Sequence, residues 1–223
     1  MSLSIESIDK MRSSFLSDPQ AKVAQNALAG NMITKLIPDA DVINSVKHTM
    51  GVKLDKWEVT NQKASGRCWL FALLNLLRPT TMNKLNVKSF EFSQAHIHFW
   101  DKFERSNYFL ESMMDLADRD ADDRTVAYML HDPIGDGGQW NMATNLVRKH
   151  GLVPKSVYPE TFTSEKSIML NGPLRKMLRT YAVELRRMIN DKGASNDAVR
   201  RQKEEYMANI YRVLCLHLGT PPQ

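Results

Sequence analysis

The feature that most constrains this chain is a polar loop that runs directly into an apolar segment. Residues 60–67 are polar or small, whereas residues 69–77 are nearly all apolar. An apolar run of this length, followed by Pro79, predicts a helix that begins near residues 65–66, is buried on most of its circumference and ends before the proline. Cys68 then lies in the first turn of that helix.

Cys68 is the first candidate for catalysis. The unpaired N–H groups at the start of a helix, with a partial positive charge of about half a unit, favour the nucleophilic thiolate, and Arg67 adds a positive neighbour. Gln62 can offer its side-chain amide to an oxyanion formed beside Cys68, together with the Cys68 backbone N–H. The alternative is a buried structural cysteine and a solvated glutamine, which is the better assumption for a lone cysteine in an apolar segment.

The whole string favours the catalytic interpretation. Residues 61–72 read Asn-Gln-Lys-Ala-Ser-Gly-Arg-Cys-Trp-Leu-Phe-Ala, which resembles the active-site segment of papain-like cysteine peptidases. No second cysteine precedes the glycine, so the segment is more similar to the intracellular branch, the bleomycin hydrolase and bacterial aminopeptidase C family. Further stretches resemble that family in the same order: residues 91–95, 99–102, 136–140, 153–160 and 218–223.

The resemblance implies a reaction and assigns roles to named residues. It implies a cysteine aminopeptidase that removes N-terminal residues from peptides through an acyl-enzyme on Cys68, with Gln62 as oxyanion donor. Gly137 and Gly138 would hold the substrate main chain, and Trp69 would contribute to substrate binding. No metal and no organic cofactor is implied.

The glycine pair also has a simpler interpretation. Paired glycines let a peptide approach the backbone closely, but residues 137–138 also precede a predicted helix over residues 141–149 that ends at Gly151. Taken alone, the pair would indicate only a turn before this helix. Beside the Cys68 segment, we favour the substrate clamp.

The histidine that a thiol peptidase needs is not identified in this chain. His217 follows Cys68 at about the distance, roughly 130–150 residues, expected for papain-type enzymes. Residues 213–218 nevertheless indicate a helix end, whereas the family's histidine lies on a strand, so we interpret His217 as a helix-end residue. The resemblance places the histidine and asparagine in a second half of the enzyme, and we expect this chain alone to be an inactive N-terminal half.

The expected fold is α+β and papain-like, with the β-rich right-hand lobe largely missing, so that this chain is mostly α. We predict three parts: a helical segment and lead-in (1–58), the left-hand lobe with the nucleophile helix (59–163), and a helical hairpin insertion (164–223). Periodic apolar residues predict helices over residues 5–30 with a break at Asp18-Pro19, and over 90–113, 165–191 and 196–218. The first segment is expected to pack on the main body. In the family, the hairpin resembles the insertion that builds a hexamer, so we predict a homo-oligomer.

Composition and cysteine use indicate a cytoplasmic protein. The chain is 43% hydrophobic and 25% charged, which is ordinary for a soluble protein. Cys68 and Cys215 have no metal-ligand spacing and suggest no disulfide framework. His96 and His98 would point to different faces of a helix, so we expect packing or surface roles for them and no shared metal. The sequence has no run of about 18 apolar residues, so no membrane partner is expected.

The net charge of +5 is concentrated at the end of the chain. Residues 171–223 hold 10 Lys and Arg against 5 Asp and Glu, and a basic face there can meet phosphate groups. The alternative function is therefore a non-catalytic papain-like remnant, or a self-assembling helical module, that binds nucleic acid. A solvated helix face is the simpler explanation of the basic residues.

The aspartates at residues 115–123 lack the glycine and glutamate of a cation loop and indicate a solvated helix end.

Overall fold

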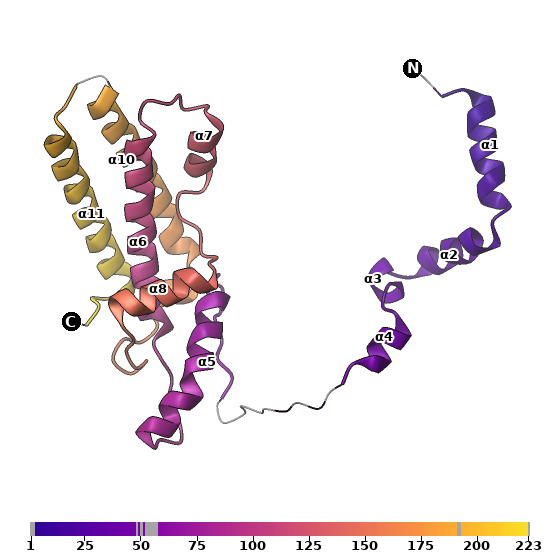
Figure 1. The fold of residues 1–223 in the computed structure, drawn as a ribbon, viewed down its shortest axis with the longest axis horizontal. Coiled ribbons are helices and arrows are strands. Elements are labelled where there is room, and N and C mark those ends of the chain that lie inside the picture. The colour runs from indigo at the N-terminus through magenta and orange to yellow at the C-terminus, as the bar shows by residue number, and fades with distance from the viewer. Residues whose placement is uncertain (1–2, 48, 50, 52–57, 191–192, 223) are drawn as a thin grey trace. The chain divides into compact units, whose positions relative to one another are not determined.

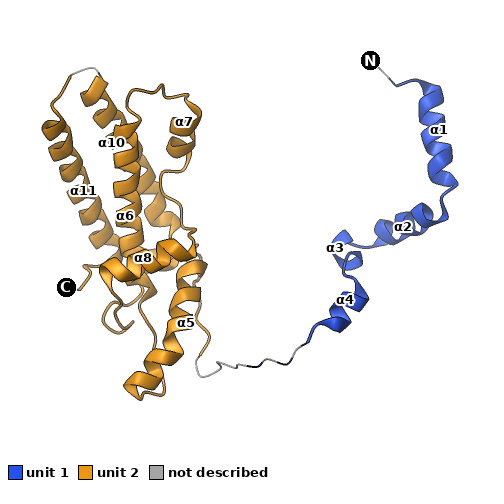
Figure 2. Cartoon of the chain, in the orientation of Figure 1, with its two compact units in different colours: residues 1–53 blue, residues 54–223 orange. Residues whose placement is uncertain are grey.

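The computed structural model describes residues 3–47, 49, 51, 58–190 and 193–222 and divides the chain into two compact units, residues 1–53 and 54–223 (Figures 1 and 2). The described residues form no β-sheet, and Phe92 and Pro154 make an isolated antiparallel bridge. The mostly helical class predicted for this chain is confirmed. Among the described helices, none is long and apolar enough to cross a membrane.

The first unit is a series of short helices: α1 (Ile5–Leu16), α2 (Pro19–Gly30), α3 (Ile33–Leu36) and α4 (Ala40–Ser45). The predicted break at Asp18-Pro19 is confirmed. Asp18 accepts hydrogen bonds from the first backbone N–H groups of α2, and Pro19 occupies a first-turn position where its missing N–H costs nothing. None of the described residues of this unit is buried. The sequence also predicts a turn at Met50-Gly51, and Met50 lies outside the described residues.

The second unit holds the remaining helices: α5 (Cys68–Leu85), α6 (Gln94–Asp115), α7 (Arg124–His131), α8 (Trp140–His150), α9 (Phe162–Glu165), α10 (Ile168–Asn190) and α11 (Asn196–Leu218). The long helices α6, α10 and α11 run side by side as a bundle, and α8 crosses beside α5 (Figure 1). The interior of the bundle is filled by fully buried side chains from all three helices, including Phe109, Met113, Leu174, Leu178, Leu185, Ile210 and Leu214.

A second apolar cluster fixes the start of α5. Leu70 and Leu73 of α5 pack with Ile97 of α6 and with Ala143 and Leu146 of α8. Leu70 and Ile97 are fully buried. Full burial of such a side chain is worth about 1.5–3 kcal/mol, so this cluster anchors the first turn of α5 against α6 and α8.

The prediction that the nucleophile helix ends before Pro79 is wrong, because α5 continues through Pro79 to Leu85. A proline inside a helix removes one backbone hydrogen bond. Here Pro79 and its neighbour Arg78 are buried, and Arg78 donates to the carbonyl oxygens of Glu58 (3.0 Å) and Phe90. These tertiary contacts hold the helix together across the proline.

The other predicted helices are found with small shifts at their ends. α6 is capped by Ser93 and begins after the bridge that involves Phe92. α8 ends at Gly151 with φ 70°, as the glycine there suggested. The hairpin helices are α10 and α11, and residues 191–192 between them lie outside the described residues. The short helices α3, α4, α7 and α9 were not predicted.

The structure and the predicted parts divide the chain at different places. The two compact units meet at residues 53 and 54, a few residues before the predicted end of the lead-in. The predicted boundary between lobe and hairpin, at residues 163–164, falls within α9. The division into lobe and hairpin stays a prediction.

Candidate active site

Cys68 is the first residue of α5, and its thiol is free and exposed. The carbonyl of the preceding residue, Arg67, accepts the first helical hydrogen bonds, from the N–H groups of Leu70 (2.9 Å) and Phe71 (3.1 Å). The N–H of Cys68 belongs to the first turn and therefore has no acceptor inside the helix. An accessible sulfur and a free backbone donor thus occur in the same residue.

The loop before Cys68 is held closed by its own side chains. The Ser65 hydroxyl donates to the carbonyl of Gln62 (2.6 Å), and the side chain of Asn61 accepts from the N–H of Lys63 (2.8 Å). Lys63 has φ 55° in the left-handed region. Gln62 is half-buried, and its Oε1 is buried without a hydrogen-bond partner. With that oxygen buried, the amide presents its NH2 group as the side that can face the surface.

Arg67, the positive neighbour of Cys68 expected from the sequence, is buried and its charge is paired. Arg67 is 1% exposed and pairs with Glu160 at 2.9 Å. Its Nε also donates to the Ser65 hydroxyl (2.8 Å), and its guanidinium lies over the ring of Phe71. The ion pair neutralises the arginine and ties the Cys68 loop to the segment before α9.

The structure brings Trp69 together with the loop that contains Gly137 and Gly138. The indole Nε1 of Trp69 donates to the carbonyl of Asp136 (2.8 Å). A Cβ atom added at Gly138 would lie 2.6 Å from the Trp69 ring, so only glycine allows this approach. The nucleophile helix and the glycine loop, separated by more than sixty residues in the sequence, therefore share one site.

Gly137 is exposed, and a Cβ atom added to it would meet nothing within 4 Å. Its carbonyl accepts a hydrogen bond from Arg105. The Arg105 guanidinium also lies 5.7 Å from the centre of the Trp69 ring. The main chain at Gly137 is thus held from one side and open on the other.

The carboxylate of Asp136 lies at the centre of a buried polar cluster beneath this loop. It accepts hydrogen bonds from Lys102 (2.6 Å), Ser167 (2.6 Å) and Asn171 (2.8 Å). Burial by itself would raise the pKa of Asp136, but the Lys102 charge and these hydrogen bonds outweigh it and hold that pKa well below its usual range. Lys102, Ser167 and Asn171 were missed as site residues. Only Lys102 falls within a stretch that resembled the family, residues 99–102.

The histidines near the site have packing roles. His96 and His98 are both nearly fully buried, and His96 accepts from the Trp100 indole (3.1 Å). Burial, with the nearby charges of Lys102 and Arg67, lowers the pKa of His98 well below its usual value, so the ring is neutral. The described residues contain no cluster of potential metal ligands.

His217 lies at the end of α11, as interpreted from the sequence. Its carbonyl accepts from the hydroxyl of Thr161 (3.0 Å), and its Nδ1 lies 3.4 Å from the hydroxyl of Thr163. Both partners lie in or beside α9. The ring therefore joins the end of α11 to α9.

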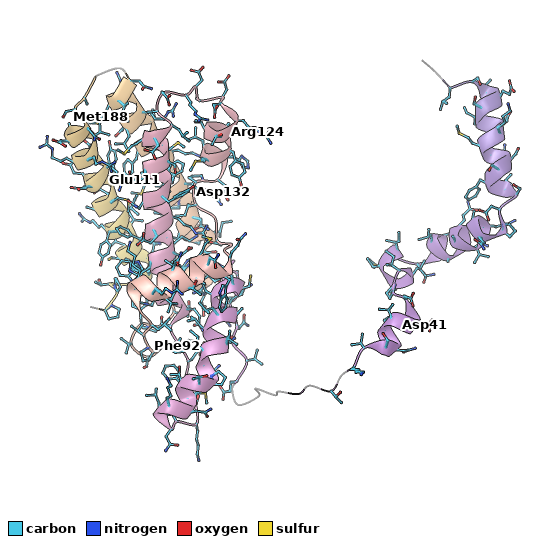
Figure 3. The ribbon with its side chains drawn as sticks, viewed as in Figure 1. Asp41, Phe92, Glu111, Arg124, Asp132 and Met188 are labelled. Atoms are coloured by element: carbon cyan, nitrogen blue, oxygen red, sulfur yellow. The ribbon has the colours of Figure 1, made fainter. Side chains whose placement is uncertain are left out.

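Much of the basic surface predicted on the hairpin is used inside the chain. Arg175 pairs with Asp132 (2.9 Å), and Arg200 (3.0 Å) and Lys203 (2.8 Å) pair with Glu111; both acids are labelled in Figure 3. Two further arginines donate to backbone carbonyls between residues 116 and 131: Arg179 and Arg186. These side chains join the bundle helices to each other and to the loops around α7.

Comparisons with known proteins find a family model, related sequences and a solved structure that are similar to this chain. The model of the Peptidase C1-like family matches residues 2–223. Aminopeptidase C of Lactobacillus delbrueckii subsp. lactis is 41% identical over 99% of this chain and 49% of its own length. Bleomycin hydrolase of Oryctolagus cuniculus is 39% identical over 92% of this chain and 76% of its own length.

A solved structure, PepW from Lactobacillus rhamnosis HN001, is 41% identical and superimposes with a TM-score of 0.88 over the whole of this chain and half of that one. This chain spans about half the length of the aminopeptidases C that it matches.

Proposed function

The chain belongs to the Peptidase C1-like family, and from this premise we propose that it carries the nucleophile of a cysteine aminopeptidase that removes N-terminal residues from peptides. The observation that carries the proposal is the exposed Cys68 at the first residue of α5, followed directly by Trp69, which contacts the loop of Gly137 and Gly138. Relatives named aminopeptidase C and bleomycin hydrolase support the reaction class.

In the proposed reaction, the Cys68 thiolate attacks the carbonyl carbon of the scissile peptide bond. A C–S bond forms, and the carbonyl oxygen becomes an oxyanion that accepts hydrogen bonds from the Cys68 N–H and the Gln62 amide. The C–N bond then breaks, the amine leaves with a proton, and water hydrolyses the thioester. Burial of the Gln62 Oε1, which leaves the NH2 group to face outward, supports the donor role.

The general base of this reaction is not assigned to a residue of this chain. The proton has to pass to an imidazole that a third group orients, and His96, His98 and His217 are all engaged in packing or a helix end. We therefore propose that the chain by itself is inactive and needs a partner half that supplies the histidine. Neither a metal nor an organic cofactor is part of the proposal.

We propose that Gly137 and Gly138 hold the substrate main chain and that the Trp69 ring, which packs against Gly138, contributes to this binding site. The open space at Gly137 supports an approaching peptide. The contact of Gly138 with the ring of Trp69, the residue after Cys68, supports a peptide that lies close to Cys68.

We also propose that the protein forms a homo-oligomer in the cytoplasm. Large apolar side chains on the outside of the hairpin support self-association, among them Val183 (63% exposed) and Leu216 (77% exposed). Burying such residues between copies would be favourable. Sedimentation velocity that detected monomers alone at micromolar concentration would contradict this part.

The nucleophile can be tested by alkylation of the chain with iodoacetamide near neutral pH, followed by peptide mass mapping. We expect Cys68 to react faster than Cys215, because its sulfur is exposed at a helix N-terminus whereas Cys215 is half-buried within α11. The Cys68→Ala and Cys215→Ala variants serve as a matched pair. Preferential labelling of Cys215 would overturn the proposal.

The oxyanion donor can be tested once a histidine-bearing half restores turnover. Gln62→Ala should then lower kcat by roughly 10²-fold or more. Gln202→Ala, on α11, should leave kcat unchanged and serves as the control. Salt-dependent retention on DNA without any peptide turnover by the reconstituted protein would favour the non-catalytic alternative.

A further inference from the structure

The carboxylate of Asp136 bonds to two helices of the second unit, α6 and α10, and to the residue before α10. Its Oδ1 accepts from Lys102 of α6 and Asn171 of α10, and its Oδ2 accepts from Ser167, which immediately precedes α10. Lys102 also donates to the carbonyl of Gly135 (2.7 Å). The residue before the glycine pair is therefore tied on one side to α6 and on the other side to the hairpin.

The other side of the same residue faces the nucleophile segment. The carbonyl of Asp136 accepts from the Trp69 indole, and a Cβ atom added at Gly66 would lie 2.5 Å from the Cβ of Asp136. Asp136 is thus clamped between the Cys68 loop and the hairpin. Because Gly137 directly follows Asp136, the position of the Asp136 carboxylate affects the main chain of Gly137.

The Asn171 amide is oriented so that its nitrogen bonds to Asp136 while its oxygen has no partner. Asn171 is 4% exposed, and while its Nδ2 bonds to Asp136, its Oδ1 is buried without a partner. An unpaired buried acceptor costs stability. The Nδ2 bond is therefore the hydrogen bond that orients the Asn171 amide, and it directs that amide at the Asp136 carboxylate.

We propose that Ser167 and Asn171 are positioning residues of the peptidase site, which hold the 135–138 loop through Asp136 so that Gly137 and Gly138 face a substrate beside Cys68. This inference rests on the proposed function and extends it, because it gives α10 a direct role in substrate alignment in addition to its place in the bundle. Neither Ser167 nor Asn171 would touch the substrate. They act through a fixed carboxylate.

The experiment compares the Ser167→Ala/Asn171→Ala variant with Asn190→Ala in the 223-residue chain. Asn190 lies at the other end of α10 and donates to the carbonyl of Ala117, so its loss tests removal of an asparagine-to-carbonyl bond away from the site. Asn171→Ala alone provides a second variant should the double one fold poorly. Thermal unfolding of all variants reports their stability separately.

The first readout is the indole N–H of Trp69, observed by 15N NMR and assigned with Trp69→Phe. In the double variant, we expect a shifted resonance and hydrogen exchange at least about tenfold faster, because the acceptor carbonyl of Asp136 loses its support. Asn190→Ala should leave both unchanged. An unchanged Trp69 signal in the double variant would overturn the positioning role.

The second readout is the rate of Cys68 alkylation by an iodoacetyl peptide divided by the rate with iodoacetamide, since the two reagents share one reactive group. We expect the wild-type ratio to exceed one and the double variant to lower it about tenfold, with the iodoacetamide rate unchanged within about twofold. A ratio retained by the double variant would overturn the positioning role. A wild-type ratio of one would instead overturn the glycine clamp of the proposed function, whatever the Trp69 signal shows.

Discussion

At the scale of single residues, the two neighbouring glycines of the loop differ in their surroundings. A Cβ atom at Gly138 would lie 2.6 Å from the Trp69 ring, whereas one at Gly137 would meet nothing within 4 Å, and neither glycine has φ in the left-handed region. A rigid aromatic ring that is itself hydrogen-bonded cannot move aside freely. The sequence alone does not distinguish these two positions.

We therefore expect Gly138→Ala to lower the free energy of unfolding by about 1–3 kcal/mol, because the methyl group displaces the Trp69 ring. Gly137→Ala is the matched control and should change the free energy of unfolding by less than about 0.5 kcal/mol. Urea unfolding followed by circular dichroism measures both. Equal effects of the two substitutions would show that the contact with Trp69 does not constrain the loop.

The lowered pKa of His98 predicts how the stability of the chain depends on pH. Its pKa is lowered well below the usual value, mainly by burial, so the folded chain keeps the ring neutral where the unfolded chain binds a proton. The contribution of His98 is therefore fully present above about pH 6.5 and is lost as the pH falls below that value. Burial lowers the pKa of His96 in the same direction.

Between pH 7.5 and 5.5, the free energy of unfolding should fall with decreasing pH, and His98 should contribute a slope of at most about 1.4 kcal/mol per pH unit. His98→Gln should reduce that slope. His131→Gln, at an exposed histidine, should retain it. Denaturant titrations at several pH values test this, and an identical slope in wild type and His98→Gln would contradict it.

At the scale of elements, the two ends of α5 are held differently, since tertiary packing anchors its first turn and a local cap closes its last turn. Its first turn has no side-chain cap at Arg67, and its last turn ends at Asn86, which has φ 52° in the left-handed region. The Asn86 N–H donates back to the carbonyls of the last turn. A helix that carries Pro79 in its interior relies on such a defined end.

We expect Asn86→Ala to destabilise the chain by about 1 kcal/mol, because alanine tolerates the left-handed region poorly. Asn86→Gly should be neutral or slightly stabilising, because glycine adopts that conformation readily. Thermal unfolding of the two variants beside wild type measures the difference. The prediction fails if alanine and glycine have the same effect.

At the scale of the whole molecule, the two units differ in their number of buried residues. Among the residues that the structure describes, every buried apolar residue lies at or after Leu70, and α1 to α4 contain no buried residue. Ion pairs such as Arg67–Glu160 and Lys102–Asp136 also lie within residues 54–223. The second unit therefore contains the contacts that stabilise the fold.

A fragment of residues 54–223 should fold on its own and unfold cooperatively, with a free energy of unfolding within about 1 kcal/mol of the full chain, since most stability comes from buried apolar area. A fragment of residues 1–53 should lack cooperative unfolding. Circular dichroism during heating compares the three proteins. A 54–223 fragment without a cooperative transition would show that the first unit contributes to the core.

The helices and the candidate nucleophile were predictable because they depend on local chemistry. Apolar spacing predicted α6, α10 and α11, and Gly151 marked the end of α8 by its own conformational preference. Continuation of α5 through Pro79 was not predictable, because it depends on burial of Arg78 and its bonds to distant carbonyls. At Pro79, tertiary packing therefore outweighs the tendency of proline to end a helix.

The sequence by itself determined the position of Cys68 at a helix start and the family to which the chain belongs, since both depend on residues adjacent along the chain. Only the tertiary structure decided that Arg67 is neutralised by Glu160 and that Asp136 is held by Lys102, Ser167 and Asn171. The physical reason is that a buried charge takes whichever partner the packed helices bring within about 3 Å. The separation of two residues along the chain does not determine how close they lie in the folded structure.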